Sequence, residues 1–217
     1  MTPQEAQALV AALPRARDRW LAKTVERVQA RSVWLAGSLG RGQADAWSDV
    51  DLVVVEGSPL LDGALVTTDN PGNGPIGGGH VGALHALGPS TGPLTLWVDW
   101  YLWPAHESVP SDTRLLRGTG SQGAHDLSAS LDRIGRGRPR PHPDRAAFAL
   151  AMLPLAAKFV ARGMNDKAAA MAAMLGASPG LAPLDGLRAV LSSIDGHDAT
   201  RELVDRYLRV VEALTPS

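Results

Sequence analysis

Two aspartates, Asp49 and Asp51, begin an apolar run that continues to Val55. Residues two apart on a strand point to the same side, with Cα atoms roughly 7 Å apart, so both carboxylates face one shared site. Carboxylates held side by side repel each other and bind protons more readily unless a cation neutralises them. Because hard oxygen ligands suit Mg²⁺ and Mn²⁺, the pair predicts a site for divalent metal ions.

A Gly-Ser turn, Gly37-Ser38, follows the apolar residues 33–36. A glycine at the end of a strand lets the backbone approach a bulky anion, while free N–H groups and the Ser38 hydroxyl can donate to phosphate oxygens. Arg41 is placed to add a charge-assisted contact to the same anion. Together with the two acids, the turn predicts a metal-dependent triphosphate site within residues 33–56.

A third acid, Asp99, stands in the middle of the apolar run 94–103, LTLWVDWYLW. Burying an unpaired carboxylate costs several kcal/mol, so Asp99 needs a partner. A metal ion is one possible partner, and a loop arginine such as Arg114 or Arg117 is the alternative. On a strand, its face also carries aromatic residues that either stack on a base or sugar or form an aromatic core, namely Trp97, Tyr101 and Trp103.

The run Gly37, Ser38, Leu39, Gly40, Arg41, followed by Ser48, Asp49, Val50, Asp51, resembles the signature of the polymerase beta-like nucleotidyltransferase superfamily. It is most similar to the aminoglycoside (kanamycin-type) nucleotidyltransferases and to minimal nucleotidyltransferases. The resemblance implies that the Gly-Ser turn meets the β and γ phosphates of a nucleotide. It also implies that the paired acids bind two Mg²⁺ ions, with Mn²⁺ as an alternative, and that Asp99 is the third acid, as metal ligand or general base.

Two further residues join the candidate site. Lys158 interrupts an apolar helical stretch, and resembling enzymes present a basic residue from this helix to the triphosphate; Arg162 is the second candidate, and a partly exposed surface lysine is the alternative. Ser48 is expected to orient Asp49 or to cap the turn. The nucleotide-binding candidates are Gly37, Ser38, Arg41, Ser48 and Lys158, and the catalytic and metal-binding candidates are Asp49, Asp51 and Asp99.

Composition sets the limits of the fold and the setting. The 217 residues fit one ordinary domain or two small ones, and the net charge of -1 gives no general attraction to nucleic acid or membranes. The chain has no cysteine, which excludes disulfides and thiolate chemistry. No apolar run reaches the length of a membrane span and residues 1–5 are no secretory signal, so a cytoplasmic setting is expected.

The spacing of apolar residues predicts which helices and strands carry the candidate residues. Residues 3–30 show helical spacing, with Pro14 expected to divide two helices. Strands are expected around the two motif runs, at 64–68 and at 94–103. The glycine-rich stretch 69–79 is expected to be a mobile loop, with a lid as the alternative. His80 and His85 are expected on the surface or in packing and not in a zinc site.

The end of the chain differs from its beginning. Residues 135–143 alternate arginine with glycine and proline and predict an extended linker, while residues 144–217 predict four short helices in a bundle. The arginines either steer an anionic substrate or are simply solvated. We therefore expect an α+β protein with a mixed β-sheet nucleotidyltransferase domain flanked by helices (1–134), a linker (135–143) and a C-terminal helical domain (144–217).

The resemblance implies an enzyme that transfers a nucleoside monophosphate, AMP from ATP, to a hydroxyl of a small molecule such as an aminoglycoside-like antibiotic, releasing pyrophosphate. A cationic acceptor would need acids facing the cleft, and five are available: Asp166, Asp195, Asp198, Glu202 and Asp205. One alternative is a protein or tRNA target, as in antitoxin-like minimal nucleotidyltransferases. The other is a nucleotide-binding regulator without turnover. The intact acids count against the regulator, and the near-neutral charge counts against tRNA.

Overall fold

The computed structural model describes residues 1–88 and 93–215. Six strands and a short 3₁₀ turn, η1, lie between an N-terminal helix and a series of C-terminal helices. The strands are β1 Ala30–Leu35, β2 Val50–Gly57, β3 Ala64–Asp69, β4 Gly79–Leu87, β5 Leu94–Trp103 and β6 Arg114–Gly118. The helices are α1 Pro3–Arg27, α2 Gly37–Gly40, η1 Pro71–Asn73, α3 Leu127–Ile134, α4 Arg145–Ala161, α5 Asn165–Met174, α6 Pro183–Ser192 and α7 Asp198–Leu214.

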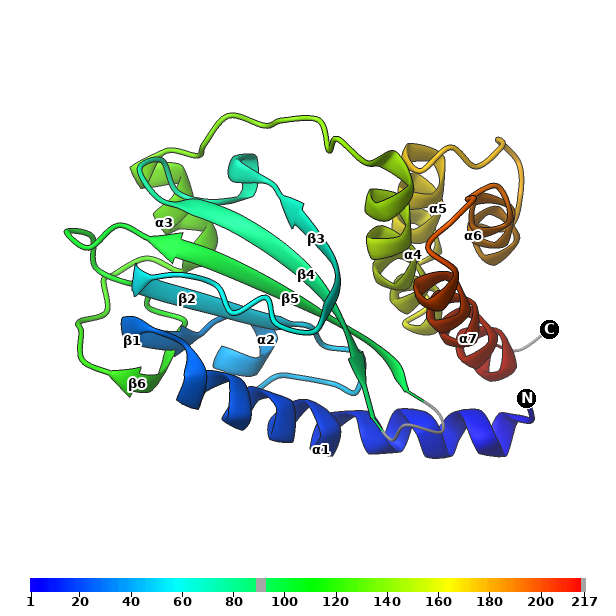
Figure 1. Ribbon diagram of the computed structural model, residues 1–217, viewed down its shortest axis with the longest axis horizontal. Helices are drawn as coiled ribbons and strands as arrows, with labels where there is room; N and C mark the ends of the chain where they lie inside the picture. Colours follow the sequence, from blue (N-terminus) through cyan, green and yellow to red (C-terminus); the bar gives the residue numbers. More distant parts are fainter. Residues whose placement is uncertain (89–92, 216–217) are drawn as a thin grey trace.

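The strands form one mixed sheet in the order β3-β4-β5-β2-β1-β6. The β2–β5 pair is parallel, and the other neighbouring pairs are antiparallel. Figure 1 shows α1 running along one side of the sheet and α4 to α7 gathered at one end of it. The expected α+β class with a mixed sheet and C-terminal helices is therefore confirmed.

Helix α1 is continuous, so the prediction that Pro14 divides it is wrong. Proline removes one backbone hydrogen bond from a helix interior. Here apolar residues on both sides of Pro14 are buried on one face of α1, namely Ala6, Leu13, Ala16 and Leu21. Packing of that whole face on the core outweighs the local loss, because most helical stability in proteins comes from tertiary contacts.

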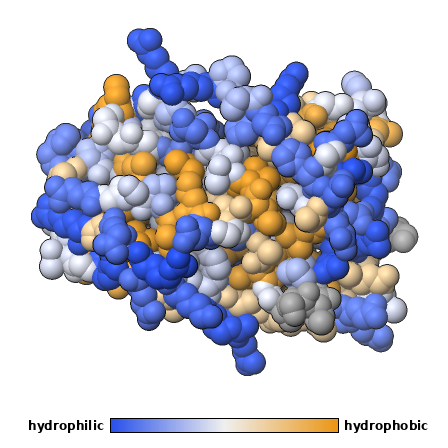
Figure 2. Space-filling model, in the orientation of Figure 1, coloured by the Kyte–Doolittle hydropathy of each residue, from blue (hydrophilic) through white to orange (hydrophobic). Residues whose placement is uncertain are grey.

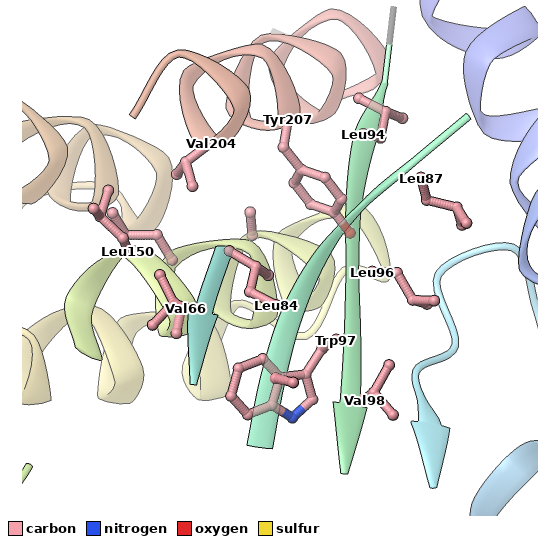
Figure 3. Close-up of a cluster of buried hydrophobic side chains, with 14 of the residues drawn as sticks. Val66, Leu84, Leu87, Leu94, Leu96, Trp97, Val98, Leu150, Val204 and Tyr207 are labelled. Atoms are coloured by element: carbon pink, nitrogen blue, oxygen red, sulfur yellow. The ribbon is translucent and has the colours of Figure 1, made fainter. Parts of the chain in front are cut away.

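The C-terminal helices share one hydrophobic core with the sheet. Leu150 of α4 and Val204 of α7 belong to the same buried cluster as Leu84 of β4 and Trp97 of β5. Figure 3 shows the ring of Tyr207 entering this cluster from α7 toward the strands. The helices predicted within 144–217 are present, whereas a domain boundary before them stays a prediction. No helix among the described residues is both long and apolar enough to cross a membrane.

The same view coloured by hydropathy shows apolar side chains toward the middle of this face and hydrophilic ones around its edges (Figure 2). The middle corresponds to the region between the sheet and the C-terminal helices in Figure 1. The shared core therefore reaches close to the surface on this side.

The sequence did not predict β4, β6 and α3, nor the short helices α2 and η1, which lie where a turn and a loop were expected. The segment 135–143 has neither helix nor strand, and it is hydrogen-bonded to the glycine-rich stretch 69–79; its role as a linker stays a prediction. The Ile76 amide donates to the Gly135 carbonyl at 2.8 Å, and the Gly137 amide donates to the Gly74 carbonyl at 3.1 Å. The two segments therefore support each other along one edge of the sheet.

Candidate active site

The Gly-Ser turn packs directly on the strand that carries the acids. The Ala36 amide donates to the Asp51 carbonyl at 2.8 Å, which joins the end of β1 to the start of β2. Gly37 has a left-handed φ of +61°, and a Cβ at this position would lie 2.0 Å from Asp51 Oδ2. Only glycine therefore fits here without displacing the Asp51 carboxylate.

Helix α2 begins at this turn and is four residues long. The first N–H groups of any helix have no partner within the helix. Gly37 and Ser38 are the first two residues of α2 and are half-buried. Their amides, with the Ser38 hydroxyl, are the donors that could meet an anion beside Asp51.

The parallel strands bring the third acid to the first two. Asp51 of β2 is in register with Asp99 of β5, and register partners on adjacent strands lie roughly 5 Å apart with side chains on one face. Burial and the charges of Asp99 and Asp49 raise the pKa of Asp51. Burial also raises the pKa of Asp49, although the Lys158 ammonium opposes this shift. The structure thus brings all three predicted acids together.

Lys158 reaches this group of acids from α4. Its ammonium forms an ion pair with Asp49 Oδ2, and the Lys158 side chain is 8% exposed while that of Asp49 is 21% exposed. The partly exposed surface lysine considered from the sequence is therefore not what is found, since Lys158 is buried at the site. A cation is already in place beside one of the three carboxylates.

Asp99 has a partner that sequence analysis missed. His80 Nε2 lies 2.9 Å from Asp99 Oδ1, and the His80 side chain is 2% exposed. Arg117, one of the two arginines considered for this acid, instead donates to the backbone carbonyls of Glu26 and Val28. His85, on the same strand as His80, is buried against the Trp20 ring at 5.0 Å between ring centres. Neither histidine lies on the surface.

The loop before Asp49 is held by a buried arginine of α1. Arg17 Nη1 donates to the carbonyls of Asp45 at 2.9 Å and Ser48 at 3.0 Å. Ser48 caps the loop, accepting from the Asp45 amide at 3.0 Å and donating to Asp45 Oδ1 at 2.8 Å. The sequence signal for Arg17 was its position between Leu13 and Leu21, each four residues away on the buried face of α1.

The other predicted arginines lie at the edge of the site. Arg162 donates to both carboxylate oxygens of Asp45, at 2.8 and 2.6 Å, and this hydrogen bonding holds the pKa of Asp45 below its usual range. Arg41 is 44% exposed and pairs with Asp112 Oδ2 at 2.9 Å. Both guanidinium groups therefore have carboxylate partners, and Arg41 also remains open to solvent.

Aromatic side chains near the acids divide into two groups. Trp97 and Trp103 are buried at 6% and 3% exposure in two separate hydrophobic clusters, which fits the core alternative. Tyr101 is half-buried, with its ring 4.9 Å from the His80 ring. Tyr207 of α7 meets Trp47 edge-on at 5.6 Å, and burial followed by the nearby Asp49 charge raises the pKa of Tyr207. Tyr207 was not a candidate from sequence.

The donor set fits a hard divalent cation, although it is not a preformed metal centre. Within residues 1–88 and 93–215, no group of three or more His, Cys, Asp or Glu side chains is arranged to hold a metal. Lys158 engages Asp49 and His80 engages Asp99, while Asp51 has no ion pair in the described part of the chain. Three neighbouring carboxylates with only one ammonium leave an excess of negative charge, and carboxylate oxygens suit Mg²⁺ or Mn²⁺.

Comparison with known proteins agrees with this geometry. No curated protein matches the chain. One segment of the chain, which begins within α1 and ends within β3, matches a protein-family model. It contains the Gly-Ser turn and the acids Asp49 and Asp51. Residues 18–66, the segment that carries Gly37, Ser38, Asp49 and Asp51, match the nucleotidyltransferase domain family.

Proposed function

We propose that the protein is a metal-dependent nucleotidyltransferase that moves a nucleoside monophosphate, AMP from ATP, onto an acceptor hydroxyl. The observation that carries the proposal is the contact of the Gly37 turn with Asp51, which is itself in register with Asp99. This contact supports the proposal because the amides at the start of α2 and the carboxylates then lie side by side. A triphosphate with its metal ions needs both features within a few ångströms.

Asp49, Asp51 and Asp99 would hold two Mg²⁺ ions, or Mn²⁺, and the metal supplies Lewis acidity and neutralises phosphate charge when bound. Gly37 and Ser38 bind the β and γ phosphates through their amides and the serine hydroxyl. The exposed guanidinium of Arg41 adds a charged donor at the edge of the site. Ser48 acts through the loop, since its hydroxyl donates to Asp45 Oδ1 and so helps to fix the position of Asp49 at the end of this loop.

The chemical step exchanges a phosphoanhydride bond for a phosphoester bond. The acceptor oxygen forms a bond to the α phosphorus, the bond from that phosphorus to the pyrophosphate oxygen breaks, and pyrophosphate leaves. Asp99 takes the proton of the acceptor hydroxyl, since a carboxylate within hydrogen-bond reach is suited to that role. Lys158, which forms an ion pair with Asp49 from α4, would supply its ammonium to the triphosphate if a metal ion were held at Asp49.

We propose a small hydroxylated acceptor, such as an aminoglycoside-like antibiotic. The near-neutral net charge supports a small acceptor over tRNA. The cavity beside Asp49, where α1, β5 and α7 meet, measures about 20 Å³ and has room for about one water molecule, so it does not by itself hold the acceptor. Recognition of a polycation by α7 is weakened by existing ion pairs of its acids, since Asp198, Glu202 and Asp205 each pair with an arginine. A macromolecular acceptor is therefore the second candidate.

Labelled ATP tests the proposal directly. The protein is incubated with ATP carrying label on the α phosphate, Mg²⁺, and separately with aminoglycosides, lincosamides, tRNA and cell extract. Label on a small molecule supports the main proposal, label on protein or tRNA supports the second candidate, and nucleotide binding without transfer supports a regulator.

Two carboxylate variants make the test specific. Asp51→Asn is expected to abolish transfer and keep the fold. Asp62→Asn, a change of the same kind at an acid with 67% exposure that pairs with Arg27, is expected to keep full activity. Normal transfer by Asp51→Asn would refute the site.

A further inference from the structure

The histidine behind the third acid is more buried than any of the three acids. His80 is 2% exposed, while the Asp99 side chain is 18% exposed. Its Nε2 contacts Asp99 Oδ1 at 2.9 Å, and its Nδ1 is buried without a hydrogen-bond partner among the described residues. Burying an imidazole with one unpartnered nitrogen costs free energy, and His85 shares this feature, since its Nε2 also has no partner among the described residues. The contact with Asp99 is what distinguishes His80 from His85.

Strand register explains why His80 is the residue that meets Asp99. In the antiparallel β4–β5 pair, Asp99 lies opposite Gly82, which has no side chain, and His80 lies opposite Tyr101. Across this pair the diagonal neighbour of Asp99 on the same face is therefore His80. A Cβ on Gly82 would lie 2.1 Å from the Trp97 ring, so the space opposite Asp99 is already filled by that indole.

The imidazole is fixed on its other side as well. Its ring lies 4.9 Å from the Tyr101 ring, at 58° between the planes. A ring enclosed in this way has little freedom to turn away from the carboxylate. With Asp99 as the acceptor, Nε2 donates this hydrogen bond, and Nδ1 is the nitrogen without a partner among the described residues.

We propose that His80 is a positioning residue that holds Asp99 for metal binding and proton acceptance; this inference rests on the proposed nucleotidyltransferase function. Asp99 stands beside Asp51, and like charges at this spacing push each other apart. The bond from His80 to Oδ1 keeps Asp99 in place and leaves Oδ2 for the metal or the acceptor hydroxyl. Hydrogen-bond partners behind metal-binding carboxylates typically change metal affinity or activity about 10- to 100-fold when removed.

The test compares two amides of different length. In His80→Gln the side-chain nitrogen reaches about as far as Nε2, whereas in His80→Asn it reaches only about as far as Nδ1. Both variants keep a buried polar group, so a purely structural role would affect them alike. His85→Asn is the matched control, because His85 is also buried on β4, at 3% exposure, and its ring packs on Trp20.

Mn²⁺ binding by calorimetry is measured first, and kcat and KM for ATP second. His80→Asn is expected to weaken Mn²⁺ binding and lower kcat by about 10- to 100-fold with little change in KM, while His80→Gln and His85→Asn retain most of both. Wild-type Mn²⁺ affinity in His80→Asn, or an equal loss in His80→Gln, would overturn the positioning role and leave the proposed function standing. A wild-type protein that binds no Mn²⁺ and transfers no label would overturn both.

Discussion

Gly37→Ala offers a test of the contact between the Gly-Ser turn and the acids. The added Cβ would lie 2.0 Å from Asp51 Oδ2 and 2.8 Å from Asp51 Cγ, well inside van der Waals contact. Because these atoms end a side chain, the Asp51 carboxylate can rotate away and the fold survives. Its displacement by about 1 Å is expected to reduce turnover about 100-fold, the usual effect of misplacing a reacting group by that distance.

The same substitution also strains the backbone, and this effect must be separated. An alanine in the left-handed region costs about 1–2 kcal/mol relative to glycine. Gly42 provides the control, since its φ is +69° and a Cβ there would have no neighbour within 4 Å. Gly42→Ala therefore has the same backbone penalty without the clash at Asp51.

Both variants are assayed by urea denaturation and by transfer of label from ATP. We expect similar losses of stability, about 1–2 kcal/mol, but a large loss of turnover in Gly37→Ala alone. Equal turnover in the two variants would show that the turn does not set the position of Asp51. The reasoning that joins the two halves of the motif would then be wrong.

Three other substitutions test the surroundings of the site. Lys158→Met leaves Asp49 without its buried ammonium and is expected to lower the free energy of unfolding by roughly 3 kcal/mol in the absence of metal. Mn²⁺ is then expected to raise the melting temperature of the variant more than that of the wild type. An equal rise in both proteins would contradict the role of the ion pair. Arg17→Met leaves the carbonyls of Asp45 and Ser48 without their donor, so the free energy of unfolding measured in urea is expected to fall by about 2 kcal/mol and turnover to fall as well. Unchanged turnover would show that the loop holds Asp49 without Arg17. Burial lowers the pKa of His85 from 6.5 to about 4, against an opposing hydrogen bond with the Gly63 backbone, so the unfolded chain binds more protons between these values. The contribution of His85 to the free energy of unfolding is therefore complete above pH 6.5 and falls by about 3 kcal/mol as the pH drops to 4. In His85→Leu, the free energy of unfolding should lose this part of its dependence on pH. An unchanged dependence would assign it to other groups.

The acids and the turn were predictable because their geometry is local. Alternation on a strand places Asp49 and Asp51 on one side, and a glycine before a serine marks a tight turn. The apolar run around Asp99 likewise predicted β5. None of these inferences required knowing which strands are neighbours, which is why they could be made from sequence.

The residues that the sequence did not reveal depend on long-range contacts. Strand β4 contains Gly79 and Gly82, which weaken a strand pattern, yet Gly82 is the position that leaves room for Trp97. His80 gained its partner only through the register of β4 on β5. Pro14 was misjudged for the same reason, since the buried face of α1 extends on both sides of it.

The acids could be found from local sequence, but their side-chain partners could not. The three carboxylates come from β2, the residue before it and β5, whereas their side-chain partners come from α4 and β4: Lys158 lies 109 residues from Asp49 in the chain, and His80 lies 19 residues from Asp99. Asp49 pairs with Lys158 and Asp99 contacts His80, whereas Asp51 has no ion pair within residues 1–88 and 93–215 and its pKa is raised. A divalent cation at Asp51 would therefore displace no ammonium, whereas at Asp49 it would compete with Lys158. Since the Gly37–Ser38 turn, which we propose binds phosphate, touches this same residue, metal and triphosphate are expected to bind together there, each favouring the other.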